Sequence, residues 1–342
     1  MDAVGVLIAL LKIVVLFAVV LLTVAELVYF ERKISAWIQN RIGPNRVGPA
    51  GLLQPYADVL KLLMKEDVVP AAANRFLHAL APVVSISIAL AALAVVPIAG
   101  SPVTLFGRSV IPVIADIDVG VLYILALSSM GVYGLTIGGW ASNNKYSLLG
   151  GLRSSAQMIS YELSMGLSLI GVVMITGSLR LDEIVRHQAG WMWNIVLQPI
   201  GFVTFLIAAF AETNRLPFDL PEAEHELVGG YHTEYSSFKF ALFYLAEYAN
   251  MITASAVIAT LYLGGWQVPG LSRLGLSTGA EIAMQIGAFL AKTAAMLFFF
   301  QWVRWSIPRF RYDQLMNLGW KVMFPAALAN IVLTALVLLF VE

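Results

Sequence analysis

Eight long apolar segments decide what this chain can fold into. They cover residues 4–30, 76–100, 119–140, 159–177, 191–211, 238–266, 280–307 and 321–341. A helix of about 20 apolar residues crosses the hydrocarbon core of a bilayer and satisfies its own backbone hydrogen bonds there. We therefore expect an all-α integral membrane protein with about eight transmembrane helices, built as a single polytopic domain over residues 1–342.

The composition supports this class and excludes several kinds of chemistry. Charged residues make up 12% of the chain, about half the share found in a soluble domain. The formal net charge of zero argues against a nucleic-acid partner. The chain has no cysteine and therefore no thiolate to hold an iron–sulfur cluster, and no glycine-rich nucleotide motif is present. We expect no iron–sulfur cluster, flavin or NAD on this chain.

A possible metal motif is incomplete. His225 and Glu226 begin a pattern that approaches the HExxH motif of zinc proteases, but Gly229 stands where the second histidine is needed. A zinc site requires three or four converging ligands. We therefore expect neither a metal site nor the catalytic residues of a protease.

Lysine and arginine are unevenly distributed over the connections between the apolar segments. The odd-numbered connections carry about 14 of these residues, and the even-numbered ones carry 4. Cytoplasmic connections of membrane proteins are enriched in Lys and Arg. The odd connections should therefore face the cytoplasm, which leaves both termini on the outer (periplasmic) side.

The first connection holds a short segment that we expect to form an amphipathic helix at the membrane interface. Pro55 suits the start of a helix, and apolar side chains between positions 56 and 64 recur at helical spacing. The segment is too short to span the bilayer. It could be an interfacial anchor, or it could form one wall of an amphipathic cavity together with Arg32, Trp37, Arg41, Tyr56 and Asp58.

The fifth connection, residues 212–235, carries the densest group of acids. It has a single arginine and six of the chain's 21 acidic residues, which are Glu212, Asp219, Glu222, Glu224, Glu226 and Glu234. Closely spaced carboxylates repel one another, and this favours uptake of a proton. Apolar and aromatic residues between the acids predict partial burial, whereas the alternative is a solvated acidic loop.

Two further glutamates, Glu162 and Glu247, fall inside expected spans. An ionisable side chain is costly there and often holds or passes a proton. Ser160 and Ser164 lie close to Glu162 in the sequence and are possible partners. The alternative for both acids is a structural hydrogen bond between helices.

Two segments resemble the signatures of a known family. Residues 31–67 are similar to the first signature of the H subunit of the proton-pumping NADH–quinone oxidoreductases (respiratory complex I), whose mitochondrial counterpart is NADH dehydrogenase subunit 1. Residues 215–248 resemble the second signature, with Pro-Phe-Asp-Leu-Pro-Glu-Ala-Glu at 217–224 and Glu-Leu-Val-Gly-Gly-Tyr at 226–231. The resemblance implies a non-redox component that binds quinone, either ubiquinone or menaquinone, as the substrate of the complex.

The resemblance also assigns roles to particular residues. A path of carboxylates for proton translocation would comprise Glu162, Glu212, Asp219, Glu222, Glu224, Glu226, Glu234 and Glu247. The quinone chamber would involve Arg32, Trp37, Arg41, Asp58 and Arg304. Some family members have another acid in the third span, where Leu127-Ser-Ser-Met130 offers only hydroxyl groups.

The same resemblance implies a place in an assembly. The chain would form the heel of a complex in the bacterial inner (plasma) membrane, where it passes the bilayer several times and contacts lipid. Its partners would be cluster-bearing peripheral-arm subunits on the cytoplasmic face, small membrane subunits and antiporter-like subunits. Quinone reduction would shift the protonation of the acidic connection, and Glu247 and Glu162 would pass that change to the next subunit.

Two other functions compete with this one. The membrane anchor of an energy-converting hydrogenase would share the ancestry but lack quinone, and the first signature favours the quinone enzyme. A self-contained secondary ion transporter would be expected to show an inverted repeat and paired broken helices, and neither is apparent in the sequence.

Overall fold

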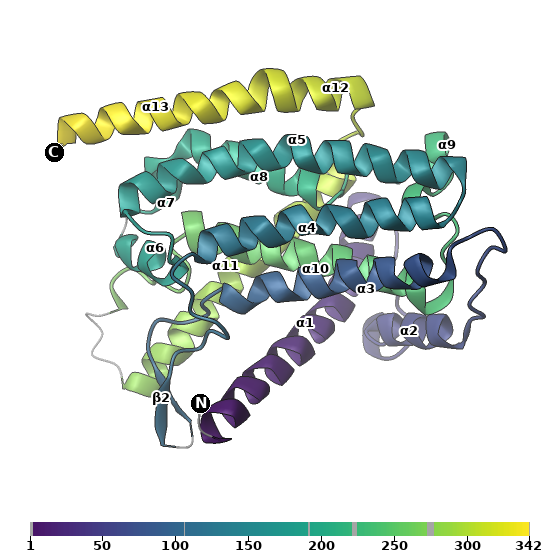
Figure 1. Ribbon diagram of the computed structural model, residues 1–342. Helices are drawn as coiled ribbons and strands as arrows, with labels where there is room; N and C mark the ends of the chain where they lie inside the picture. Colours follow the sequence, from purple (N-terminus) through teal and green to yellow (C-terminus); the bar gives the residue numbers. More distant parts are fainter. Residues whose placement is uncertain (1–2, 106, 191, 221–223, 272–276, 342) are drawn as a thin grey trace.

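The computed structural model describes residues 3–105, 107–190, 192–220, 224–271 and 277–341. These residues form mainly helices, together with a small antiparallel hairpin (Figure 1). The elements are α1 (Ala3–Ile38), η1 (Pro49–Gly51), α2 (Gln54–Met64), α3 (Arg75–Ala92), η2 (Leu93–Val95), β1 (Val103–Leu105), β2 (Arg108–Val110), α4 (Gly120–Ala141), α5 (Lys145–Thr176), α6 (Leu181–His187), α7 (Asn194–Leu197), α8 (Pro199–Glu212), α9 (Glu224–Leu227), η3 (Gly230–His232), α10 (Ser237–Tyr262), α11 (Thr278–Ser306), α12 (Tyr312–Asn317), the π-helical turn η5 (Leu318–Met323) and α13 (Phe324–Val341).

Within the described residues, seven helical segments are long and apolar enough to cross a membrane. They contain α1, α3, α4, α5, α10, α11 and the continuous stretch from α12 to α13. This confirms the predicted all-α membrane fold. The short amphipathic helix expected in the first connection is α2.

The fifth expected span, residues 191–211, is not one long helix. Its described part forms α7 and then α8, a 14-residue apolar helix that begins at Pro199. Proline has no backbone N–H and clashes with the preceding turn, so it starts a new helix at this point. Fourteen residues rise about 21 Å, which is short of the roughly 30 Å hydrocarbon core, and α7 supplies part of the missing length.

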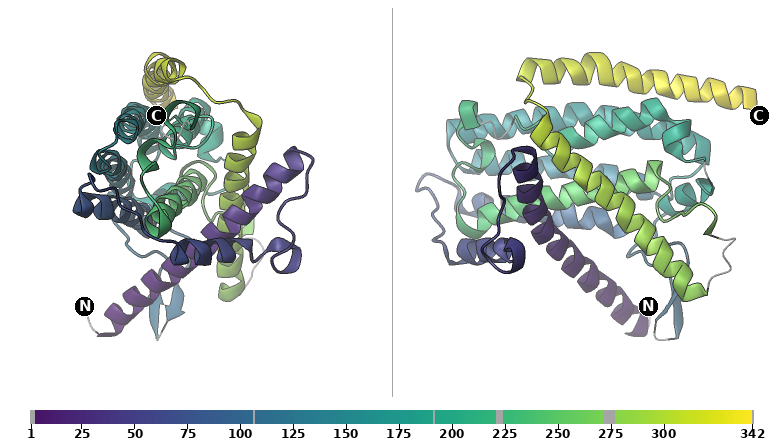
Figure 2. Two further views of the ribbon diagram at one scale, coloured as in Figure 1. Left: turned by 90° about the vertical axis from the view of Figure 1, so that its right-hand side faces the viewer. Right: turned by 180° about the vertical axis from the view of Figure 1, so that it is seen from behind.

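The long helices form a bundle with two oblique helices on one side. Figure 1 shows α3, α4, α5, α8 and α10 nearly side by side, with α13 along α5. Figure 2 shows α1 and α11 crossing this bundle at an angle. The start of α1 and the end of α13 lie at the same end of the bundle as the hairpin, and α2 and α9 lie at the opposite end. This arrangement fits an even number of crossings, and the outward orientation of the termini stays a prediction.

Two glycines allow close packing next to the acidic connection. A Cβ atom on Gly139 would lie 2.4 Å from the Ser147 carbonyl oxygen, so α4 and α5 can approach there only because the side chain is absent. A Cβ atom on Gly150 would lie 2.6 Å from the backbone nitrogen of Tyr231 in η3. Small residues at such contacts are typical of membrane helix pairs. Gly150 thus lets the second half of the acidic connection pack directly against α5.

Neutral amides are buried at the other end of the bundle. Asn330 of α13 donates a hydrogen bond to the side-chain oxygen of Gln198 at 2.7 Å, and Gln198 donates to Thr334 at 2.7 Å. Nearby, Gln188 accepts from the backbone N–H groups of Asn194 and Gly264. We call Gln188, Asn194, Gln198 and Asn330 the amide cluster; all four are buried, and they tie α6, α7 and α13 into the bundle.

Candidate functional site

Four segments bring charged side chains together at the end of the bundle that carries α2 and α9. Glu31 comes from α1, Arg215 from the connection after α8, Glu247 and Tyr248 from α10, and Arg304 from α11. We call these five residues the charged junction. Its two carboxylates and two guanidinium groups balance, so the cluster is neutral as a whole.

Glu31 lies at the centre of the charged junction. Its Oε1 accepts a hydrogen bond from Arg304 Nη1 at 2.5 Å. Its Oε2 accepts from Arg215 Nη1 at 2.9 Å and from the Tyr248 hydroxyl at 2.9 Å. Arg215 also pairs through Nε with Glu247, and its guanidinium lies 4.1 Å from the centre of the Tyr248 ring. The charges therefore alternate in the order Glu247, Arg215, Glu31, Arg304.

Arg215 is buried, so the ion pairs of the charged junction depend on one another. The Arg215 side chain is 3% exposed. Burial by itself lowers the pKa of Arg215, but the neighbouring charges of Glu247 and Glu31 outweigh this effect and hold that pKa well above its usual range. Arg215 therefore stays charged and depends on both carboxylates. Breaking a buried ion pair of this kind costs about 3–5 kcal/mol, because a charge is left without its partner.

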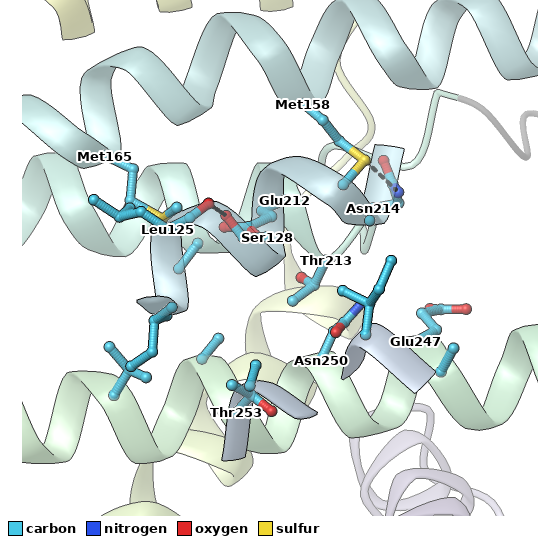
Figure 3. A pocket seen from close by; sticks show the side chains of 18 of the residues that line it. Leu125, Ser128, Met158, Met165, Glu212, Thr213, Asn214, Glu247, Asn250 and Thr253 are labelled. Atoms are coloured by element: carbon cyan, nitrogen blue, oxygen red, sulfur yellow. Dashed lines mark hydrogen bonds between the residues drawn. The ribbon is translucent and has the colours of Figure 1, made fainter. Parts of the chain in front are cut away.

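A cavity of about 80 Å³ adjoins the charged junction. One water molecule needs about 10–15 Å³ of such volume, so several waters fit. Most of the lining is apolar, and the polar groups include Ser128, Glu212, Thr213, Glu247 and Asn250. Figure 3 shows these side chains around the cavity, with Glu212 and Glu247 contributed by different segments. Glu212 and Glu247, two of the expected path carboxylates, therefore line one cavity that has room for several waters.

Glu212 and Glu162, two expected path residues, both contact α4. The Ser128 side chain lies close enough to interact with Glu212, and that of Ser129 lies close enough to interact with Glu162. Glu162 and Glu212 are also close enough for their charges to interact. Ser128 and Ser129 lie in α4, the third expected span, at the place where the resemblance suggested another acid.

The remaining acids of the fifth connection have separate partners. Asp219 pairs with Arg309 at 2.7 Å, and Glu226 pairs with Arg153 at 2.5 Å. Glu234 accepts a hydrogen bond from the Asn144 side chain at 2.5 Å. The structure therefore distributes these acids over several neighbouring elements. Glu222 and the side chain of Glu224 lie outside the described residues.

The residues expected at the quinone chamber fall into three groups. Arg32 pairs with Asp58 at 2.6 Å, which joins α1 to α2. Arg304 belongs to the charged junction. Trp37 is 68% exposed, and Arg41 binds the side chains of Gln39 and Ser35 beyond the membrane part of α1. Of these five residues, Arg32, Asp58 and Arg304 contribute to ion pairs that join separate helices.

Three members of the charged junction were not among the predicted site residues: Glu31, Arg215 and Tyr248. Arg215 carried a usable signal, because it is the single arginine among six acids in residues 212–235. Glu31 begins a charged run at the end of the first apolar segment and looks like an interfacial residue. Its partners are 184 to 273 positions away in sequence, and no local pattern identifies them.

Comparison with known proteins gives consistent matches over almost the whole chain. The family model described as NADH dehydrogenase matches residues 11–335. NADH-quinone oxidoreductase subunit 8 of Rhodothermus marinus is 57% identical over 326 residues, which cover 92% of this chain and 93% of the relative. An H subunit of NADH-quinone oxidoreductase from Geobacter metallireducens is 54% identical over 337 residues, which cover 98% of each chain.

Proposed function

The chain belongs to the family of the H subunits of NADH-quinone oxidoreductase, and on this premise we propose that it helps to form the quinone site and couples quinone reduction to proton translocation. As a member of this family it is a multi-pass component of complex I in the bacterial inner membrane, and its partners are the other subunits of the complex. Family membership favours the quinone enzyme over the hydrogenase anchor and the secondary transporter.

The observation that carries the proposal is the position of the charged junction next to the cavity. Glu247 belongs to both, since it pairs with Arg215 and lines the cavity. The chain has no cysteine, so we assign the iron–sulfur clusters to partner subunits. The share of this chain is to bind the quinone and to respond to its charge.

Arg304 is the guanidinium of the charged junction that a ligand can reach most easily. Its side chain is 23% exposed, compared with 3% for Arg215. Reduction of a quinone to a quinol takes up two electrons and two protons, and negative charge develops on the headgroup before the protons arrive. That charge attracts Arg304, which then binds Glu31 less strongly.

The change then passes along the alternating charges. Glu31 interacts more strongly with Arg215 when Arg304 is drawn away. Arg215 in turn holds Glu247 less tightly, and a buried carboxylate with a weakened partner takes up a proton. Water in the cavity can deliver that proton and connect Glu247 to Glu212. Movement of charge at the quinone is thereby converted into movement of a proton in the bundle.

The test compares two glutamates at opposite ends of the bundle. Glu247→Gln keeps the shape of the side chain but removes its ability to exchange a proton. We expect quinone-linked proton translocation by the assembled complex in membrane vesicles to fall by about 100-fold or more. Electron transfer from NADH to an artificial acceptor should be unchanged, because it does not involve the quinone.

Glu281→Gln is the matched control. Glu281 also accepts side-chain hydrogen bonds, from Ser101 and Gln285, but it lies in the first turn of α11, far along that helix from Arg304. We expect this variant to pump like the wild type. Wild-type pumping by Glu247→Gln would contradict the proposal.

A further inference from the structure

Two adjacent serines of α4 contact two different carboxylates. The Ser128 side chain lies beside Glu212 at the end of α8, and Figure 3 shows the two side chains next to each other. The Ser129 side chain lies close enough to interact with Glu162 of α5. Successive residues of an α-helix point about 100° apart. The two hydroxyl groups therefore face different neighbours of the same helix.

The two serines also lie in different surroundings. Ser128 and Glu212 both line the cavity. Ser129 is exposed and Glu162 is half-buried, and the nearby residues Met130 of α4 and Ile159 of α5 are exposed apolar side chains. The step from Ser128 to Ser129 therefore leads from the internal cavity to the outer face between α4 and α5.

The Ser128 hydroxyl has one hydrogen and two acceptors within reach. It donates to the Leu125 carbonyl oxygen at 3.2 Å and also contacts Glu212. When Glu212 is ionised, the hydrogen can turn to the carboxylate. When Glu212 is protonated, the carboxyl can donate to the serine oxygen while the serine hydrogen remains on the Leu125 carbonyl. The same hydrogen bond can thus be made in both protonation states of Glu212.

We propose that Ser128 and Ser129 form the hydroxyl link by which a proton crosses α4 from Glu212 to Glu162. This inference rests on the proposed function, because it adds a step to the proton path. The Glu212 carboxyl gives its proton to the Ser128 oxygen while the Ser128 hydrogen passes to Ser129, directly or through a bridging water molecule. The Ser129 hydrogen passes to the Glu162 carboxylate. One O–H bond breaks and one forms at each serine, so both serines end as neutral hydroxyls.

The experiment uses the assembled complex in membrane vesicles and removes one hydroxyl at a time. Ser128→Ala and Ser129→Ala should each lower quinone-linked proton translocation by about 10- to 100-fold. This is at or below the low end of the effect of a positioned acid or base, because waters can replace part of the link. In both alanine variants, D₂O should slow proton translocation, relative to H₂O, by a larger factor than in the wild type. A purely structural change would not cause this. Ser128→Thr and Ser129→Thr keep the hydroxyl and should restore most of the rate.

The matched control is another hydroxyl pair between the same two helices. Thr136 of α4 and Ser155 of α5 lie 2.5 Å apart, and Thr136→Val or Ser155→Ala should leave pumping unchanged. Wild-type pumping by both alanine variants, with pumping lost in Glu212→Gln and Glu162→Gln, would overturn the hydroxyl link and leave the proposed function standing. Wild-type pumping by the two glutamine variants as well would overturn both.

Discussion

The charged junction and the amide cluster bury polar groups at opposite ends of the same bundle. Both connect helices that are far apart in the sequence, and most of their side chains are buried. The charged junction uses carboxylates and guanidinium groups, whereas the amide cluster uses neutral amides with a threonine hydroxyl as a further partner. Amides tie helices together without the high cost of burying a charge.

The difference indicates what each end is for. An amide stays uncharged at any pH met by a cell, so the amide cluster can only hold α6, α7 and α13 in place. A carboxylate can gain or lose a proton, and an ion pair can be broken by a competing charge. The charged junction is a costly way to join helices. We infer that the charged junction is retained despite this cost because it lets this end of the bundle respond to charge.

The largest effect on stability should come from Arg215→Ala. This change leaves Glu31 and Glu247 buried with one common partner fewer, which costs about 3–5 kcal/mol of the free energy of unfolding. Thermal unfolding of the purified protein in detergent measures the loss. Arg311→Ala is the control, since the Arg311–Asp313 pair is exposed and should contribute close to nothing. Equal stability of the two variants would contradict the energetic role given to the charged junction.

Asn330→Ala should have the next largest effect. It removes the donor for the Gln198 side-chain oxygen and leaves a buried acceptor unsatisfied, at a cost of about 1–3 kcal/mol. The ratio of protons translocated to NADH oxidised should not change in the complexes that assemble. A normal melting temperature combined with a lower ratio would reverse the roles that we assign to the two ends.

Of the three changes, Glu226→Gln should have the smallest effect on stability. The Glu226–Arg153 pair is partly exposed, with 39% and 31% of the two side chains accessible. Such pairs contribute about 0–1 kcal/mol and weaken further with added salt. Unfolding measured at low and high salt would show whether the difference from the wild type shrinks as expected. A loss of stability as large as that of Arg215→Ala would mean that burial does not explain the energetic difference between the Glu226–Arg153 pair and the charged junction.

Hydropathy predicted most of the fold, because the length and apolar character of a membrane span are local properties of the sequence. The break before α8 also had a local cause in Pro199. Glu162, Glu212 and Glu247 were identifiable because ionisable groups in or beside apolar segments are rare. The pairing of Glu31 with Arg215 and Arg304 could not be predicted, since it depends on how α1 and α11 cross the bundle. The contacts of Ser128 and Ser129 depend on helix rotation, which the apolar pattern of α4 does not fix.

The central claim is that the charged junction must be able to change its charge for quinone reduction to move protons. Glu31→Gln tests it most directly, because this side chain joins Arg304 to Arg215. The measurement is the ratio of protons translocated to NADH oxidised by the assembled complex in sealed membrane vesicles. We predict a ratio far below that of the wild type, with normal electron transfer from NADH to an artificial acceptor. A wild-type ratio in a fully assembled Glu31→Gln complex would contradict the account.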